Sequence, residues 1–335
     1  MKVQTIISSV AAALAVFYLG SVAQASQPVT IAISTVGNAG NAADPSTGYG
    51  SVGYTFGIGT YDVTLTQYTA FLNAVAQTDT YGLYNSNLDG RDSKIGGCIA
   101  QSGVSGSYTY SAMGDGQRPV TYVSWFDAAR FTNWLSNGQP VTHVEDATTT
   151  ETGAYTLNGD LTNGMEAKSA NAQWWIPSED EWYKAAYYDP NQGGLGVGGY
   201  WSYATRSNTV PGNSWANRTL ANEANYLNGG FTLSGPYLTD VGAFTNSASA
   251  YGTYDQAGNV WNWSDASISG SHRGLRGGSW NDDSGGLRSS YRGDDIPTNE
   301  NYLIGFRVAT VPEPSSIMLI GLGGILLAAL RSKPF

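Results

Sequence analysis

Apolar side chains recur at helical spacing near the start of the body of this chain. They fall at i, i+3, i+4 and i+7 and are Tyr68, Phe71, Leu72 and Val75. This spacing is typical of a helix with one buried face. We therefore expect a helix through residues 67–77, capped by the hydroxyl of Thr66.

Two more helices are predicted from their start signals. Ser124 is followed three residues later by Asp127, and Ser178 is followed three residues later by Glu181. A hydroxyl residue followed at this spacing by an acidic one satisfies the free amides of a helix N-terminus. Gly138 is placed to end the first of these two helices.

The rest of the body has little periodicity. Residues 27–60 predict short strands and turns, residues 78–117 predict a loop region, and residues 190–310 predict mostly irregular backbone. The sequence holds 43 glycines and 10 tryptophans. We expect buried tryptophans and bound ions to order this backbone. No segment repeats at a fixed period, which argues against solenoids and propellers.

The first 25 residues predict a secretory signal peptide. Lys2 precedes an apolar run over residues 6–19, and Ala23-Gln24-Ala25 supplies the small residues of a cleavage site. The mature body would then span residues 26–310.

Residues 311–335 predict a sorting and anchoring segment. Pro312-Glu313-Pro314 precedes an apolar stretch over 317–330 and a basic end. The stretch is shorter than the about 20 residues of a spanning helix. The segment resembles the PEP-CTERM sorting tail, which implies export, a transient stay in the inner membrane and cleavage by an exosortase-type protease. A plain membrane anchor is the alternative.

Charge and cysteine content argue against nucleic-acid binding and against an internal disulfide. The chain has 26 acidic and 16 basic residues, and such an acidic body repels nucleic acid phosphates. The only cysteine is Cys98, so no internal disulfide can form. We expect this thiol to be a small buried apolar group.

Five segments in order, over about residues 54–309, resemble the formylglycine-generating enzyme (sulfatase-modifying factor) family. They are Gly59-Thr60-Tyr61-Asp62-Val63-Thr64, Arg118-Pro119-Val120 with Val123-Ser124-Trp125, Ile176-Pro177-Ser178-Glu179-Asp180-Glu181-Trp182, Ala257-Gly258-Asn259-Val260-Trp261-Asn262-Trp263, and Arg276-Gly277-Gly278-Ser279-Trp280 closing at Gly305-Phe306-Arg307. The resemblance implies an α+β domain with a C-type-lectin-like fold, few helices and much irregular structure.

The resemblance also implies a chemistry that this sequence lacks. Active members hold copper with two cysteines, and the matching positions here are Asp282 and Leu287. A carboxylate and an aliphatic side chain do not bind Cu(I), which prefers soft thiolates. A relative of the family uses three histidines on iron, whereas only His143 and His272 occur here. We therefore expect neither copper nor formylglycine formation.

Part of the family's pocket is retained. Trp261 and Ser279 match residues that line it, and with Asp282 they form our candidate ligand site. The alternative is that these residues only pack. The acidic pairs Asp282-Asp283 and Asp294-Asp295 are typical of solvated loops, with a cation-assisted sugar site as the other reading.

Structural calcium is the cofactor that the resemblance implies. One set of family ligands matches Asp255, Gly258, Val260 and Asn262, and a second begins at Asn225 and Tyr226. Carboxylate, amide and backbone oxygens in an irregular loop suit this hard cation. Asn262 stands where the family usually has Glu, which should weaken the first site.

These observations favour a non-catalytic module, exported to the cell surface or extracellular matrix, that binds a glycan, a peptide or a matrix component. Two alternatives remain: an oxidoreductase-like enzyme with a retuned site, and a purely structural matrix protein. A Ser-His-Asp hydrolase is disfavoured because no Gly-x-Ser-x-Gly motif occurs.

Overall fold

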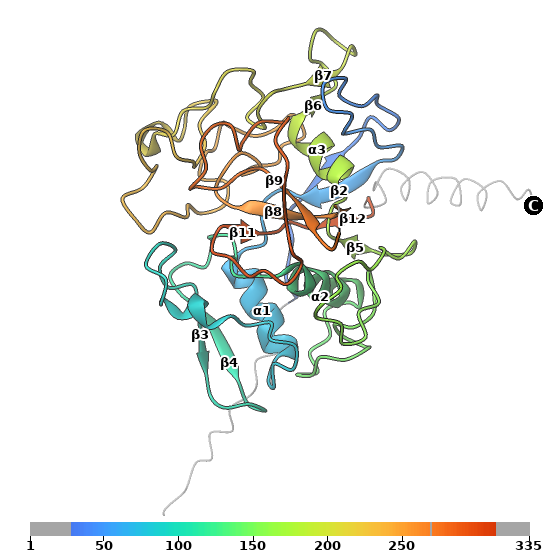
Figure 1. Cartoon of the computed structure of the whole chain (residues 1–335), viewed down its shortest axis with the longest axis vertical. Coiled ribbons are helices and arrows are strands. Elements are labelled where there is room, and N and C mark those ends of the chain that lie inside the picture. Colours follow the sequence, from blue (N-terminus) through green and yellow to red (C-terminus); the bar gives the residue numbers. More distant parts are fainter. Residues whose placement is uncertain (1–27, 269, 313–335) are drawn as a thin grey trace, which may run out of the picture.

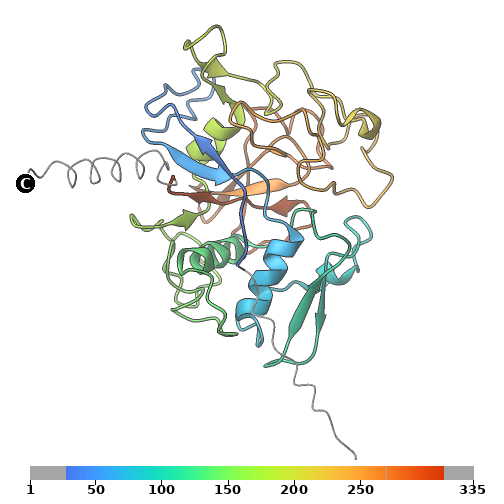
Figure 2. The same cartoon turned by 180° about the vertical axis from the view of Figure 1, so that it is seen from behind.

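The computed structural model describes residues 28–268 and 270–312. Their architecture is α+β, as the sequence predicts. Two four-stranded sheets lie at the centre; helices α1 and α2 pack on one side of them and α3 on the other (Figures 1 and 2). The predicted signal peptide and nearly all of the sorting segment lie outside the described residues.

The first sheet has the strand order β1-β2-β12-β5, and its pairs are antiparallel. Its strands are β1 (Ile33–Val36), β2 (Phe56–Gly59), β12 (Ala309–Thr310) and β5 (Trp174–Trp175). The two ends of the described body therefore meet in one sheet. Phe56 and Ile58 of β2 are fully buried.

The second sheet has the order β10-β9-β8-β11, with β8 and β11 parallel. Its strands are β10 (Gly293–Asp295), β9 (Arg273–Arg276), β8 (Trp261–Ser267) and β11 (Ile304–Gly305). It is formed from segments that the sequence predicted as irregular. Two small hairpins complete the strands: β3 (Ile99–Ser102) with β4 (Thr109–Ala112), and β6 (Tyr188–Asp189) with β7 (Gly199–Tyr200).

All three predicted helices are present. They are α1 (Leu65–Val75), α2 (Trp125–Ser136) and α3 (Glu179–Tyr187), and two short 3₁₀ turns lie at Ser86–Asp89 and Trp215–Asn217. The predicted caps Ser124 and Ser178 are confirmed, each in a capping box. The predicted cap Thr66 is wrong. Thr64 caps α1, because its hydroxyl accepts from the Gln67 amide while the Gln67 side chain accepts from the Thr64 amide.

A buried ionic network joins the two sheets. Arg307 Nη2 lies 2.7 Å from Asp62 Oδ1, and Arg307 Nε donates to Asn262 Oδ1 at 2.8 Å. The Asn262 amide donates to Asp62 Oδ1 at 3.0 Å, and Trp182 Nε1 donates to Asn262 Oδ1 at 3.0 Å. Burial nevertheless raises the pKa of Asp62 to about 6. These contacts fix β8 against the segment before α1.

Acidic side chains around α2 give the fold a pH dependence. Burial raises the pKa of Asp127, and the nearby charge of Glu300 raises it further. Burial also raises the pKa of Glu145 to about 7. Groups with raised carboxyl pKa values bind more protons in the folded state than in the unfolded state between about pH 4 and these folded pKa values. The free energy of unfolding should therefore fall as pH rises through this window.

We expect the protein to be several kcal/mol less stable at pH 8 than at pH 5, because linkage gives about 1.4 kcal/mol per pH unit for each such group. Asp127→Asn keeps an oxygen for the Ser124 amide, which donates to Asp127 at 2.7 Å, but removes the ionisation. Denaturant unfolding from pH 5 to pH 8 should show a flatter profile for this variant. Parallel profiles for the two proteins would contradict the assignment to Asp127.

Candidate functional site

The candidate site lies on the loop that follows β9. Ser279 is fully buried, and its hydroxyl donates to Asp282 Oδ2. The Ser279 amide donates to the same oxygen at 3.0 Å. The Leu227 amide donates to the backbone carbonyl of Asp282 at 2.9 Å. Asp282 thus closes a local turn, and this use of its carboxylate is structural.

Leu287 is fully buried on the other side of this loop. It packs in an aromatic cluster, the second core of the molecule, whose larger members are Trp182, Tyr183, Tyr187, Tyr203 and Tyr226. A Cβ added at Gly278, which has a φ of +74°, would stand 2.8 Å from Leu287 Cδ1. The glycine therefore lets the loop after β9 pass close to this side chain, and Leu287 serves packing.

The sequence predicts that Trp261 lies beside Ser279 and Asp282 in one ligand site. Its backbone pairs with the strand before Phe306, and its amide donates to Leu303 at 2.8 Å. Its ring packs against Tyr291, with centroids 5.8 Å apart, and against Gly293. The structure thus brings Ser279 and Asp282 into direct contact, while the ring of Trp261 contacts the far end of the same loop.

An arginine of β9 holds this loop in place. Arg276 Nη1 donates to the Ser289 carbonyl at 3.0 Å, and Arg276 Nε donates to Glu179 Oε1 at 2.8 Å. Glu179 Oε2 also lies 2.8 Å from Arg292 Nη2. The loop is therefore tied to the first turn of α3 by ion pairs. The sequence analysis missed this role of Arg276, although the residue stands in the quoted Arg-Gly-Gly-Ser-Trp string.

The remaining ionisable candidates have structural partners. His143 is exposed, and its Nδ1 lies 3.1 Å from the Asn73 carbonyl oxygen. His272 Nδ1 lies 2.6 Å from Asp294 Oδ2, and the side chains are about two-fifths exposed. Asp283 accepts from the Gly285 amide at 2.8 Å. The histidines thus contact different elements, and neither contacts Ser279 or Asp282.

Cys98 is buried, as the sequence predicts. Its sulfur lies 3.6 Å from the Gly96 carbonyl oxygen, and burial raises the pKa of its thiol to about 11. Such a thiol stays protonated at neutral pH and is a poor metal ligand and nucleophile. Within residues 28–268 and 270–312, no group of three or more His, Cys, Asp or Glu side chains is arranged to hold a metal ion.

The contacts of Asn262 show whether this member of the first predicted calcium site is free to bind a cation. Both lone pairs of its side-chain oxygen are used, since Trp182 and the positively charged Arg307 donate to it. An oxygen in this position does not fit a calcium site. Asp255 Oδ2 accepts from the Gly242 amide at 2.7 Å, and burial raises the pKa of Asp255 to about 7. A cation here would depend on Asp255 and the carbonyls of Gly258 and Val260.

The second calcium set is joined to the first through backbone contacts. Asn225 forms an isolated bridge with Gly258, and its side-chain Nδ2 donates to Asn259 Oδ1 at 3.0 Å and to the Tyr237 carbonyl at 2.9 Å. The carbonyl of Tyr226 accepts from Asn213 Nδ2 at 3.2 Å. These hydrogen bonds order loops that we had expected bound ions to order.

Calcium binding therefore remains a prediction, and it rests on Asp255. If this loop binds calcium, saturating Ca²⁺ should stabilise the protein by about 2.7 kcal/mol at one hundred times Kd. Calorimetric titration and thermal unfolding of the protein and of Asp255→Asn measure this. We expect calcium to release or absorb binding heat and to raise the Tm of the wild type but not of Asp255→Asn. No binding heat and an unchanged Tm in the wild type would contradict the prediction.

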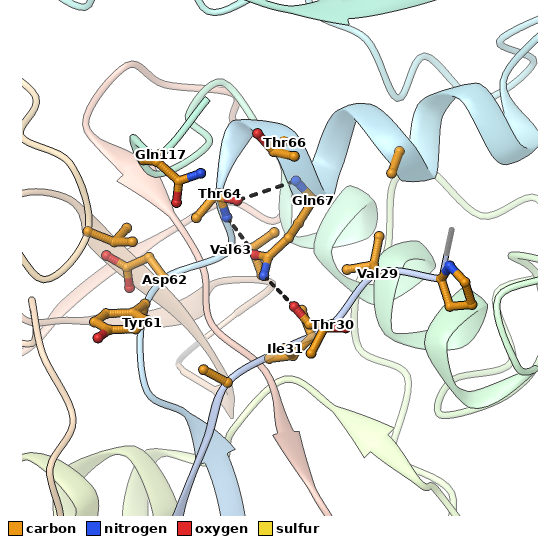
Figure 3. A pocket seen from close by; sticks show the side chains of 14 residues that line it. Val29, Thr30, Ile31, Tyr61, Asp62, Val63, Thr64, Thr66, Gln67 and Gln117 are labelled. Carbon is orange, nitrogen blue, oxygen red and sulfur yellow. Dashed lines mark hydrogen bonds between the residues drawn. The ribbon is translucent and has the colours of Figure 1, made fainter. Parts of the chain in front are cut away.

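A cavity of about 600 Å³ lies away from the candidate site, between the first described residues and the start of α1 (Figure 3). Tyr61 and Asp62 lie at one end of it, and the Gln67 side chain bridges Thr64 and Thr30 across it. Among the described residues that line it, the one carboxylate is Asp62, which is paired with Arg307. These residues therefore offer no acid–base pair free for catalysis, and no sequence motif indicated this cavity.

Comparison with known proteins identifies the family. The model of the sulfatase-modifying factor enzyme 1-like domain matches residues 32–311, which is most of the chain. The chain belongs to this family. A PEP-CTERM protein-sorting motif matches residues 310–333, which indicates export and a C-terminal sorting tail recognised by an exosortase. Among the described residues, no helix has the length and apolar character needed to cross a membrane.

Curated relatives are hercynine oxygenases. The protein of Mycolicibacterium smegmatis is 31% identical over 167 residues, covering 43% of this chain and 35% of that protein. The protein of Mycobacterium tuberculosis is 30% identical over 198 residues, covering 52% and 41%. The chain thus spans about two-fifths of the length of these relatives.

Two solved structures share the fold. Treponema denticola variable protein 1 aligns with a TM-score of 0.52 at 19% identity, covering 86% of this chain and 98% of its own. CarF aligns with a TM-score of 0.50 at 21% identity, covering 85% and 99%. At these identities the likeness concerns the fold alone, and it supports the predicted family architecture.

Proposed function

We propose that this sulfatase-modifying-factor-like domain is an exported recognition module that binds an extracellular ligand and does not oxidise thiols. The main support is the environment of Asp282 and Leu287, the two residues that stand where active members of the family have cysteines. Asp282 is bonded to Ser279, and Leu287 is buried in the second core. Neither side chain is a soft metal ligand, and both make contacts that stabilise the fold.

The single thiol gives further support. Cys98 is buried among backbone carbonyls, and its raised pKa keeps it protonated at neutral pH. One such thiol does not replace two thiolates as a Cu(I) site. The PEP-CTERM motif supports a place outside the cell, at the surface or in the matrix.

A second candidate is an enzyme with a retuned site. The observation that favours it is the 30–31% identity to proteins named hercynine oxygenase. Since this chain spans about two-fifths of those proteins, their activity is only a candidate here.

Measuring oxygen consumption distinguishes a recognition module from an enzyme. The full chain would be mixed with a cysteine-containing peptide, with and without copper or ferrous iron, in an oxygen electrode, and the peptide mass would be followed. We expect no protein-dependent oxygen uptake and no thiol-to-aldehyde conversion. Metal-dependent uptake that persists in Cys98→Ser would overturn the proposal and favour the enzyme.

A further inference from the structure

A row of aromatic rings borders the candidate site. It is formed in order by Phe231, Tyr237, Trp280, Tyr302 and Tyr122, and we call it the aromatic row. The successive centroid distances are 4.3, 4.7, 5.9 and 6.3 Å. The rings come from four segments that are far apart in the sequence. Trp280, in the middle of the row, directly follows Ser279 of the candidate site.

The row is partly open to solvent. Phe231 is 42% exposed, Tyr237 and Tyr302 are half-buried, and Trp280 forms the buried floor between them at 2% exposure. Tyr237 stacks on Trp280 with an interplanar angle of 23°. Tyr122, like Trp280, is buried, so the surface of the row that meets water is formed by Phe231, Tyr237 and Tyr302. Adjoining apolar rings that stay in contact with water mark a binding surface.

Polar groups line the edges of the aromatic row. Lys94 Nζ stands 4.2 Å from the ring centre of Tyr302, and the Tyr122 hydroxyl donates to Asp92 at 2.8 Å. Trp280 Nε1 is buried and has no acceptor among the described residues. Because a buried donor without a partner is costly, this N–H is placed to donate a hydrogen bond to a bound molecule or water.

We infer that the aromatic row binds the pyranose rings of a neutral polysaccharide. This inference rests on the proposed function and names its ligand class. Sugar rings present C–H faces that lie on aromatic rings, while their hydroxyl rims need donors and acceptors at the edges. The row offers both. The strongly exposed aliphatic side chains, such as Leu195, Val104 and Val197, lie on other segments, which disfavours an apolar helix as ligand.

The ligand is neutral because the charges around the row are mixed. Lys94 lies over the ring of Tyr302, while Asp92 and Asp282 bring negative charge to the neighbouring segments. The whole chain is acidic, with a formal net charge of −10. Acidic polysaccharides and nucleic acids are therefore repelled at a distance.

Affinity electrophoresis of the full chain in gels containing β-glucan, xylan, galactomannan or alginate tests this inference. We expect retardation by at least one of the three neutral polymers and none by alginate. Phe231→Ala and Tyr302→Ala should each weaken the retardation about tenfold, as loss of an aromatic contact does at binding surfaces. Trp215→Ala is the matched control, because this aromatic residue is 37% exposed but lies outside the row.

Three results would overturn the inference: no retardation in any neutral gel, retardation by alginate alone, or retardation that survives both substitutions in the row. Far-UV circular dichroism of each variant checks that it is folded. Failure of the inference is distinct from failure of the proposed function. Absence of sugar binding together with absence of oxygen uptake would leave a non-oxidising module with another ligand, whereas oxygen uptake would reject the module itself.

Discussion

Arg307→Met is expected to reduce the free energy of unfolding by about 3–5 kcal/mol, the usual effect of removing one partner of a buried ion pair. The guanidinium is completely buried, and it donates to Asp62, Asn262 and the Gly59 carbonyl. Its loss would leave the Asp62 carboxylate buried without its counter-charge. Chemical denaturation of the two proteins at pH 7 measures the difference.

Arg91→Met is the matched control for this prediction. Arg91 also pairs with a carboxylate, Asp89 at 3.0 Å, but its side chain is 64% exposed. An exposed pair contributes less than about 1 kcal/mol. Equal effects of the two substitutions would show that the Asp62–Arg307 pair does not hold the sheets together as described.

Gly258→Ala is expected to destabilise the protein by about 3 kcal/mol or more, because it combines backbone strain with a steric clash. Gly258 has a φ of +85°, and an added Cβ would stand 2.1 Å from the Asn225 carbonyl oxygen. The backbone bridge between the two loops would have to open. Thermal and denaturant unfolding measure the loss.

Gly229→Ala separates the two causes. Gly229 has a similar φ of +70°, yet an added Cβ meets no atom within 4 Å. This control should cost only about 1 kcal/mol, the penalty for a side chain in the left-handed region. If both variants lose the same stability, the close approach of Asn225 to Gly258 is not a constraint of the fold.

The helices were predictable because their signals are local. Ser124 with Asp127 and Ser178 with Glu181 are capping boxes that need only four consecutive residues. The cap of α1 was missed by two residues because Thr64 and Thr66 are both hydroxyl residues near the same apolar face. Only Thr64 has Gln67 three residues later to return the hydrogen bond.

The second sheet was not predictable in the same way. Trp261 of β8 pairs with Ile304, and Asn262 pairs with Arg276, so the strand is defined by partners far along the chain. Its first four residues are all buried, so the polar Asn262 and Ser264 lie inside as well as the two tryptophans. Long-range pairing and burial override the local pattern here.

The candidate site was predicted in part. The contact between Ser279 and Asp282 is present, while the position of the Trp261 ring and the role of Arg276 came only from the structure. The aromatic row was missed because no motif links Phe231, Trp280 and Tyr302 in sequence. Only the fold brings these rings together.

The proposed function requires that the Ser279–Leu287 loop offers no site for a soft metal ion. Titration of Cu(I) against a chromogenic chelator of known affinity tests it directly, with the full chain and with Cys98→Ser. We expect that neither protein withdraws copper from the chelator. One equivalent of copper taken up by the wild type and retained in Cys98→Ser would contradict it, since a site without this thiol would then hold the metal.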